Sequence, residues 1–158
     1  MTMTPMPLSP DALDELMPKL LAAARLARQQ AYAPYSNFAV GAALLDESGR
    51  IHAGCNIENA AYPQGQCAEA SALAHLVLAG GRRIQAAAVV GVVPGETAQP
   101  VSPCGGCRQR LREFAADDCP IWLADLQQVL ARHTLGELLP ASFGPAHLTG
   151  QPLKGQAS

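Results

Sequence analysis

Apolar side chains recur three and four positions apart between residues 13 and 27, which predicts an amphipathic helix near the start of the chain. Ser9, Pro10 and Asp11 look like the start of that helix. They offer a capping hydroxyl, a proline suited to the first turn and an acid near the positive end of the helix dipole. Pro18 interrupts the pattern, so either the helix is kinked there or a short helix ends and the main one begins. We expect the helical stripe to extend to about residue 31.

Short apolar runs predict five strands. Residues 38–45 are almost continuously apolar, which is typical of a strand covered on both faces. The polar turn at 46–49 and the segment 51–58 complete an antiparallel hairpin. Residues 84–93 and 121–124 are predicted to be further strands, and 128–133 is a candidate for the fifth.

Two further helices are predicted to begin at cysteines. The first runs from Cys67 to the pair Gly80 and Gly81, and the second runs from Cys104 to near Asp117. The residues predicted to form the buried side of the first are Ala70, Leu73, Ala74, Val77 and Leu78. A brief helix at 134–139 starts with Thr134 and Glu137 at capping-box spacing. This order of elements predicts an α/β fold with three layers, α/β/α, around a mixed five-stranded sheet.

Length and composition indicate one domain with an aliphatic core. The chain has 158 residues, of which 49% are hydrophobic and only 4% aromatic. We expect a domain over residues 9–148, with flexible tails at 1–8 and 149–158. The formal net charge of -2 gives no basic field for a polyphosphate backbone, so we expect no nucleic-acid partner.

The apolar runs are too short to cross a bilayer, so no membrane partner is expected either. The chain has five cysteines and no recognisable secretory signal. Cysteines in such a chain are more often metal ligands or catalysts than disulfides, which predicts a soluble, cytoplasmic protein.

Three cysteines and one glutamate, namely Cys67, Glu69, Cys104 and Cys107, fall at the starts of the two predicted helices. Three protein ligands that leave the fourth position of zinc open are typical of a catalytic site, whereas a structural zinc is held by four. A fourth ligand from Cys55, Cys119 or a histidine would instead make a zinc-stabilised interaction module without catalysis. A thiol pair at a helix start also suits redox chemistry. Redox chemistry needs neither the third thiol nor the acid, however, whereas a zinc deaminase uses both.

Together with several other motifs, these residues give the chain a family resemblance. The motifs are Tyr32-Ala-Pro-Tyr-Ser, Gly41-Ala-Ala-Leu-Leu, Cys55-Asn-Ile-Glu-Asn, Cys67-Ala-Glu, Pro103-Cys-Gly-Gly-Cys-Arg-Gln and Glu137-Leu-Leu-Pro. Over nearly its whole length the chain resembles the small, zinc-dependent, homotetrameric cytidine deaminases. The resemblance implies a cytidine-deaminase-like fold, one zinc ion per chain and a homotetramer. It also implies hydrolytic deamination of cytidine and 2′-deoxycytidine to uridine and 2′-deoxyuridine, with release of ammonia, in pyrimidine salvage.

The resemblance also assigns roles to single residues. Cys67, Cys104 and Cys107 match the zinc ligands, and Glu69 matches the acid that shuttles protons while zinc-activated hydroxide attacks C4 of the base. The positions that match nucleoside-binding ones are Phe38, Asn56 and Glu58, with Ala68 offering its backbone to the base and Phe143 reaching into a neighbouring subunit's site. Tyr62 can line the site or simply anchor its loop.

Plainer alternatives stay open for the nucleoside-binding positions. Asn56 and Glu58 stand two apart on a predicted strand and so face one side, as a ribose site requires, but a solvated strand end reads the same way. Phe38 can be an ordinary core aromatic. Within the enzyme class, deamination of an analogue such as blasticidin S is the alternative, and the acidic Glu58 argues against it.

One position departs from the family pattern. Many members with three cysteines have Arg directly after the catalytic Glu, where this chain has Ala70. Three thiolates around zinc leave a net negative centre that weakens the metal's effect on its water. We expect the two helix N-termini and Arg108, which follows Cys107, to compensate for this charge, although Arg108 can also be a plain exposed helical residue.

Overall fold

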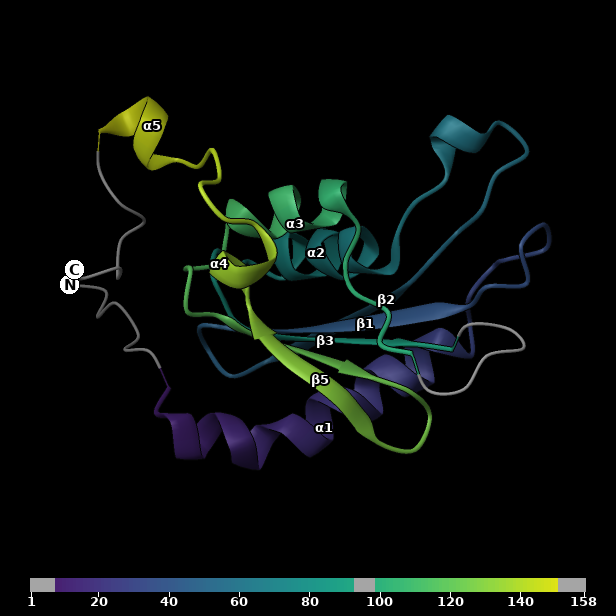
Figure 1. The fold of residues 1–158 in the computed structure, drawn as a ribbon, viewed down its shortest axis with the longest axis horizontal. Coiled ribbons are helices and arrows are strands. Elements are labelled where there is room, and N and C mark those ends of the chain that lie inside the picture. The colour runs from purple at the N-terminus through teal and green to yellow at the C-terminus, as the bar shows by residue number, and fades with distance from the viewer. Residues whose placement is uncertain (1–7, 93–98, 151–158) are drawn as a thin grey trace.

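A mixed five-stranded sheet forms the middle layer of the structure, a computed structural model that describes residues 8–92 and 99–150 (Figure 1). The strands are β1 (Val40–Asp46), β2 (Ile51–Cys55), β3 (Ile84–Gly91), β4 (Pro120–Ala124) and β5 (Val129–Thr134). They are arranged in the order β2-β1-β3-β4-β5. The pair β3 and β4 is parallel and the other neighbours are antiparallel, which confirms the mixed sheet.

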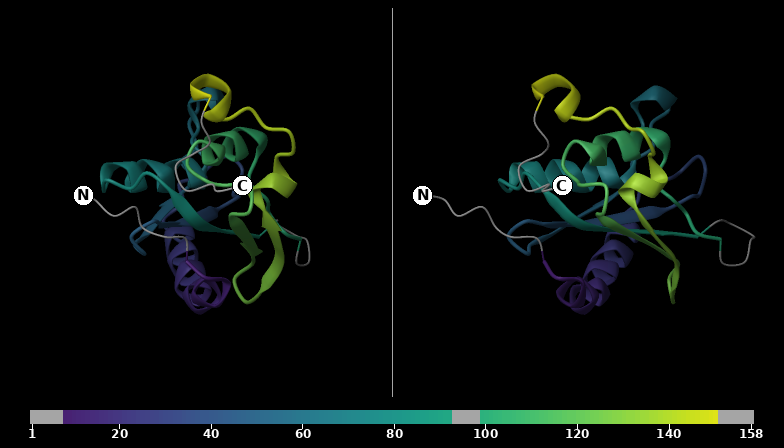
Figure 2. Two further views of the ribbon diagram at one scale, coloured as in Figure 1. Left: turned by 90° about the vertical axis from the view of Figure 1, so that its left-hand side faces the viewer. Right: turned by 60° about the vertical axis from the view of Figure 1, so that its left-hand side comes forward.

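Helices cover both faces of this sheet. Helix α1 (Pro10–Arg28) lies on one face, and α2 (Ala68–Leu78) and α3 (Gly105–Arg112) lie on the other. Figure 2 shows the same three layers from two further sides. Side chains alternate along β1, so that Leu45 packs on the α1 side while Leu44 packs on the side of α2 and α3. The predicted three-layer architecture is therefore confirmed.

Two glycines let the backbones of strands and helices approach closely. A Cβ atom on Gly41 would lie 2.0 Å from the carbonyl oxygen of Ala24 in α1. A Cβ atom on Gly54 would lie 2.3 Å from the backbone nitrogen of Ala72 in α2. Only glycine fits at such distances. The contact at Gly54 fixes the first half of α2, where the predicted site begins.

Helix α1 is one element that runs through Pro18. Ser9 is its N-cap and its hydroxyl accepts a hydrogen bond from the Ala12 N–H, as predicted. The helix ends at Arg28, about three residues earlier than expected. Pro18 is exposed on the outer side, so of the two alternatives the structure favours a single helix over two.

The predicted buried face of α2 is wrong except at Leu73, which is partly buried against the core. The buried residues are Ala68, Glu69, Ser71, Ala72 and Leu76. Val77 and Leu78 are instead 37% and 87% exposed. Because α2 carries apolar side chains on every side, its own pattern does not choose a face. The close contact with Gly54 does so, since it presses the side of Ala68 and Ala72 against β2.

Several element ends differ from the predictions by a few residues. β1 begins at Val40 rather than residue 38, β2 ends at Cys55 rather than 58, β3 ends at Gly91 rather than 93, and α3 ends at Arg112 rather than near 117. The fifth strand is confirmed, and so is the capping box of α4 (Leu135–Leu138). Two short helices were not predicted, η1 (Tyr62–Gln64) and α5 (Ala146–Thr149).

The tails predicted at 1–8 and 149–158 lie almost entirely outside the described residues. Leu8 packs on the α1 side of the core and Thr149 ends α5. In the part of the chain that the structure describes, no helix has the length and apolar character needed to cross a membrane.

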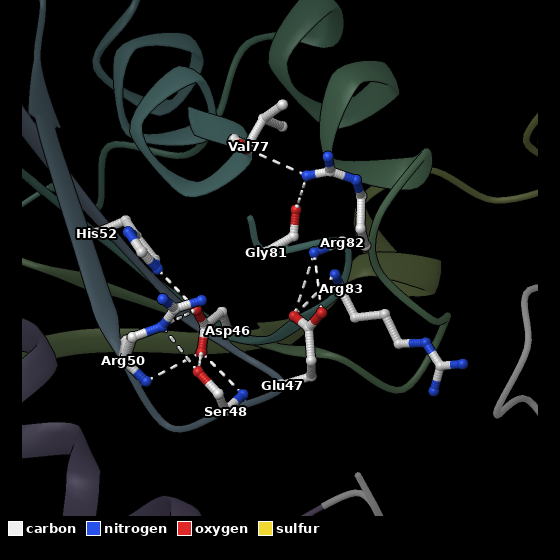
Figure 3. A network of polar contacts seen from close by, with 9 residues as sticks. All are labelled: Asp46, Glu47, Ser48, Arg50, His52, Val77, Gly81, Arg82 and Arg83. Carbon is white, nitrogen blue, oxygen red and sulfur yellow. Dashed lines mark hydrogen bonds and ion pairs between the residues drawn. The ribbon is translucent and has the colours of Figure 1, made fainter. Parts of the chain in front are cut away.

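A buried carboxylate closes the hairpin between β1 and β2 (Figure 3). Asp46 is 0% exposed and accepts hydrogen bonds from the backbone and side chain of Ser48, from the backbone and Nε of Arg50, and from His52 Nε2 at 2.8 Å. Burial opposes its ionisation, but the donated hydrogen bonds outweigh burial and hold the pKa of Asp46 well below its usual range.

The neighbouring carboxylate joins this hairpin to the start of β3. Glu47 accepts hydrogen bonds from the backbone N–H groups of Arg82 and Arg83, at 2.9 and 3.1 Å. The guanidinium of Arg82 turns back to the last turn of α2 and donates to the carbonyl oxygens of Val77 and Gly81 (Figure 3). The far end of α2 is thereby held, while its other end carries the site.

Candidate active site

Three thiols converge where α2 and α3 begin. The Sγ atoms of Cys67, Cys104 and Cys107 lie within 4.8 Å of one another, and those of Cys67 and Cys104 are 3.8 Å apart. Cys67 is the N-cap of α2, Cys104 is the N-cap of α3, and Cys107 lies in the first turn of α3. The positive ends of two helix dipoles therefore face the cluster, which favours thiolates.

The thiols fit a zinc ion. Zinc–sulfur bonds of about 2.3 Å in a tetrahedral arrangement separate sulfurs by about 3.8 Å, as observed between Cys67 and Cys104. Among the described residues, this is the group of three or more Cys, His, Asp and Glu that can hold a metal ion, and it contains no fourth member. Cys119 is instead buried in the core, where desolvation raises the pKa of its thiol to about 12. The geometry thus favours the three-ligand site over the closed structural one.

The electrostatics of the thiols also call for a cation. The hydrogen bond from Cys107 is the main reason that the pKa of Cys67 falls to about 6, with Cys104 and the positive charge of Arg110 adding to it. The pKa of Cys107 is raised in turn, because its proton bonds to Cys67, it is buried, and Glu69 lies beside it. One thiolate forms readily and a second is opposed, so a bound dication is needed to hold all three ionised.

Glu69 is the carboxyl group of the site. It lies in the first turn of α2, is 5% exposed, and its Oε2 accepts a hydrogen bond from Cys107 Sγ at 3.4 Å. Burial raises the pKa of Glu69, and its own backbone N–H, the Cys107 thiol and the charge of Arg110 oppose that rise only in part. A carboxyl group with a raised pKa takes up a proton more readily than an ordinary glutamate does, as a proton shuttle requires.

Asn56 and Glu58 flank Ile57, a residue that pairs with the segment leading to Cys67. Ile57 exchanges two backbone hydrogen bonds with Gln66, at 2.9 and 2.8 Å, and Gln66 directly precedes Cys67. In extended chain the residues on either side of Ile57 face away from it together. They follow the end of β2 rather than lying within it.

Both side chains also hold neighbouring backbone. The amide of Asn56 accepts from the Val40 N–H and donates to the Phe38 carbonyl oxygen, each at 2.8 Å. This leaves the amide one further donor and one further acceptor. Glu58 accepts hydrogen bonds from the hydroxyl and N–H of Ser36 and from the Tyr35 N–H, and these bonds lower its pKa. The ionised carboxylate of Glu58 is therefore fixed beside the turn at residues 34–36, which precedes β1.

Aromatic side chains lie around this turn. Tyr62 of η1 is 78% exposed and its ring centroid lies 6.4 Å from that of Tyr35. Phe38 is half-buried and packs against the core on the side of α2 and α3. Its backbone N–H bonds to the Ser36 hydroxyl, so Phe38 belongs to the same turn. The structure brings Phe38, Asn56, Glu58 and Tyr62 into one region, which continues into Cys67.

Comparison with known proteins decides which family has this site. Residues 15–123 match the family model described as the cytidine and deoxycytidylate deaminase zinc-binding region, and this range includes the three thiols and Glu69. The chain belongs to the cytidine and deoxycytidylate deaminase family. Its relatives include a cytidine deaminase of Sporosarcina psychrophila, 47% identical over 131 residues, which are 83% of this chain and 93% of the relative.

Solved structures in the same deaminase family share the fold. A cytidine deaminase from Burkholderia pseudomallei superposes with a TM-score of 0.71 at 41% identity, covering 86% of this chain and all of that one. One from Mycobacterium tuberculosis gives a TM-score of 0.69 at 38% identity, covering 81% of this chain and 97% of that one. The α/β fold of this chain is therefore that of the cytidine deaminases.

Phe143 stands apart from the other predicted site residues of this deaminase chain. It is 56% exposed, its carbonyl oxygen accepts from Gln109 Nε2, and its ring stacks on His147 of α5 with centroids 5.0 Å apart. In Figure 1, α5 and η1 lie at opposite ends of the helical layer. Among the described contacts, none joins Phe143 to the other predicted site residues, and its place in a neighbouring subunit's site stays a prediction.

Two arginines of α3 differ in their surroundings. The guanidinium of Arg108 donates to the carbonyl oxygens of Pro103 and Leu138 and to the Ser102 hydroxyl, at 2.7 to 2.8 Å. Its described partners are oxygens of the flanking loop and α4, and none is a thiol. Sequence reasoning gave no role to Arg110, whose positive charge favours lower pKa values for Cys67 and Glu69, although burial still raises that of Glu69. Its distance of three residues from Cys107, one helical turn, was the available signal.

Proposed function

We propose that this protein catalyses the hydrolytic deamination of cytidine and 2′-deoxycytidine to uridine and 2′-deoxyuridine, with release of ammonia. One observation carries the proposal: three thiols at two helix N-termini converge beside a buried carboxyl group that is not among the metal-binding group. The similarity to cytidine deaminases over most of the chain supports the substrate class.

Cys67, Cys104 and Cys107 would hold one zinc ion per chain. When bound, zinc supplies a Lewis acid that allows a water molecule to ionise near neutral pH. The two helix N-termini favour the ionised form of the sulfurs, and the burial of Cys107 limits the access of bulk water from that side. Cys104 is exposed, so the centre is reached from its side.

Glu69 moves the protons of the reaction. Its carboxylate takes a proton from the attacking water and delivers it to N3 of the base as the new C4–O bond forms. A second proton then passes through Glu69 to the amino group, and the C4–N bond breaks to release ammonia. The raised pKa of Glu69 suits this role, since it makes the carboxylate readier to accept the proton that it then delivers.

The nucleoside would lie between the metal centre and the turn before β1. The free donor and acceptor of Asn56 and the fixed carboxylate of Glu58 suit ribose hydroxyls. Phe38 and Tyr62 offer aromatic surface, and the backbone of Ala68 at the start of α2 offers its polar groups to the base. An acidic ribose contact favours cytidine over blasticidin S.

We further propose a cytoplasmic homotetramer in pyrimidine salvage. Exposed aromatic residues at positions 35, 62 and 143 support assembly, because such residues are enriched at protein interfaces. The five cysteines are not paired in disulfides, in keeping with a reducing compartment.

Zinc content and cytidine turnover, measured on the same preparation, test the proposed function. The parent is expected to hold one zinc per chain and to lower the ultraviolet absorbance of cytidine as uridine forms. Cys104→Ser is expected to lose both properties, whereas Cys55→Ser, outside the cluster, is expected to keep them. Zinc-loaded protein that leaves cytidine unchanged would contradict the proposal. Turnover of blasticidin S in that case would assign the analogue instead, and no turnover of either would leave a structural zinc module.

A further inference from the structure

The proposed metal centre carries a net negative charge that the two helix N-termini offset only in part. Three thiolates and one divalent zinc sum to a charge of about −1, and an ionised Glu69 adds another. Residue 70, in the first turn of α2, is an alanine and supplies no cation. Cys104 is exposed, so part of this charge faces solvent. A cation near the first turn of α3 would therefore strengthen zinc binding.

Arg110 lies where such a cation is needed. It follows Cys107 by one turn of α3, and its Nη1 lies 3.3 Å from the position that a Cβ atom on Gly106 would occupy. Gly106 lies between Cys104 and Cys107 in sequence. The guanidinium is thus folded back along α3 toward the helix N-terminus, over a residue that has no side chain to displace it.

The other arginines of α3 are already engaged. Arg108 is bound to oxygens of the loop before Cys104 and of α4. Arg112 pairs with Asp117 and donates to Ser142 and Ala115. Among the described residues, Arg110 has no hydrogen-bond or ion-pair partner, and its guanidinium lies over Gly106, the residue that directly precedes Cys107.

We propose that Arg110 is a positioning residue whose positive charge offsets that of the three-thiolate centre and so tightens its hold on zinc. The inference rests on the proposed function, since it takes Cys67, Cys104 and Cys107 as the zinc ligands. The effect is electrostatic, acts through solvent at an exposed position, and is therefore sensitive to ionic strength.

Competition with a chromophoric zinc chelator measures this effect without reference to activity. Arg110→Gln is expected to weaken zinc binding by about threefold to tenfold at low ionic strength, and the deficit is expected to shrink at about 0.5 M salt. Arg110→Lys, which keeps the charge, is expected to stay within about twofold of the parent. Arg83→Gln removes an equal charge at the start of β3, outside the site, and is expected to leave zinc affinity unchanged.

Two outcomes would overturn the inference. One is an Arg110→Gln variant that binds zinc as tightly as Arg83→Gln. The other is an Arg110→Lys variant that loses as much affinity as Arg110→Gln, which would trace the effect to packing rather than charge. Cys104→Ser separates this failure from failure of the proposed site, because a variant that keeps its zinc would show that the thiols are not the ligands.

Discussion

Two acidic side chains are buried in the described part of the chain, and their surroundings move their pKa values in opposite directions. Asp46 receives five donated hydrogen bonds, so its charged form is stabilised and its pKa is lowered. Glu69 receives few, so desolvation dominates and its pKa is raised. Asp46 is therefore suited to holding a structure together, and Glu69 to exchanging protons.

Replacing Glu69 by Gln tests this assignment. Glu69→Gln keeps the shape of the side chain but can no longer carry protons, so turnover of cytidine is expected to fall by about two to four orders of magnitude. Zinc content is expected to stay at the parent level, because Glu69 is not a member of the thiol group. Steady-state kinetics and metal analysis of one preparation give both values. Loss of zinc together with turnover would instead make Glu69 a ligand.

Replacing Asp46 by Asn tests the structural role of the other buried acid. The folded-state pKa of Asp46 lies below its ordinary value of 3.8, so its charge adds stability above that pH, and this stability is lost as pH falls through the lower, folded-state pKa. Asp46→Asn is expected to cost about 2 to 4 kcal/mol in the free energy of unfolding at pH 6, and less at pH 3.

Urea unfolding at the two pH values measures the change, with Asp14→Asn on the exposed side of α1 as control. An equal loss at both pH values would mean that the charge of Asp46 is not what stabilises the hairpin.

At the scale of elements, the start of α3 is held by hydrogen bonds to the loop before it and to α4. Arg108 ties the loop before Cys104 to the end of α4 through three hydrogen bonds. Arg108→Gln is expected to lower the free energy of unfolding of the zinc-free protein by about 2 kcal/mol, because it removes charge-assisted bonds to partly buried oxygens. Chemical unfolding measures this, with Arg83→Gln as the control.

Zinc binding distinguishes this role from that of Arg110. If Arg108→Gln binds zinc more weakly than the parent, the loss of affinity is expected to persist at high salt. The cause would be a less well ordered segment around Cys104 rather than a lost charge. If Arg108→Gln instead keeps its stability and loses zinc affinity only at low salt, the function of Arg108 would be to compensate the charge of the zinc centre.

The helices that begin after Cys67 and Cys104 were predicted from sequence, and the first of them ends just before the pair Gly80 and Gly81, as that glycine pair indicated. The strands could also be predicted, because short, continuous apolar runs such as 38–45 are typical of strands buried on both faces. The buried face of α2 could not be predicted, because it depends on a glycine of β2, remote in sequence. The roles of Arg108 and Arg110 were also out of reach, since each depends on where a long side chain folds.

At the scale of the whole molecule, the question is whether a single chain completes its own site. Phe143 is exposed and is held by Gln109 in the segment that leads to α5, apart from Tyr62 and the turn that it contacts. If Phe143 completes the site of a neighbouring subunit, two defective variants can complement each other. A Glu69→Gln chain still donates Phe143, and a Phe143→Ala chain still carries Glu69.

Equal amounts of the two variants, unfolded together without zinc and refolded with it, are expected to recover roughly a quarter of the parent's turnover per chain, since random mixing pairs an intact Glu69 with a donated Phe143 in that share of sites. Each variant refolded alone is the control, and light scattering on the same samples reports the assembled mass. If Phe143 acts within its own chain, no mixed site has both residues. The mixture would then show only half the turnover of Phe143→Ala, and the proposed exchange between subunits would be wrong.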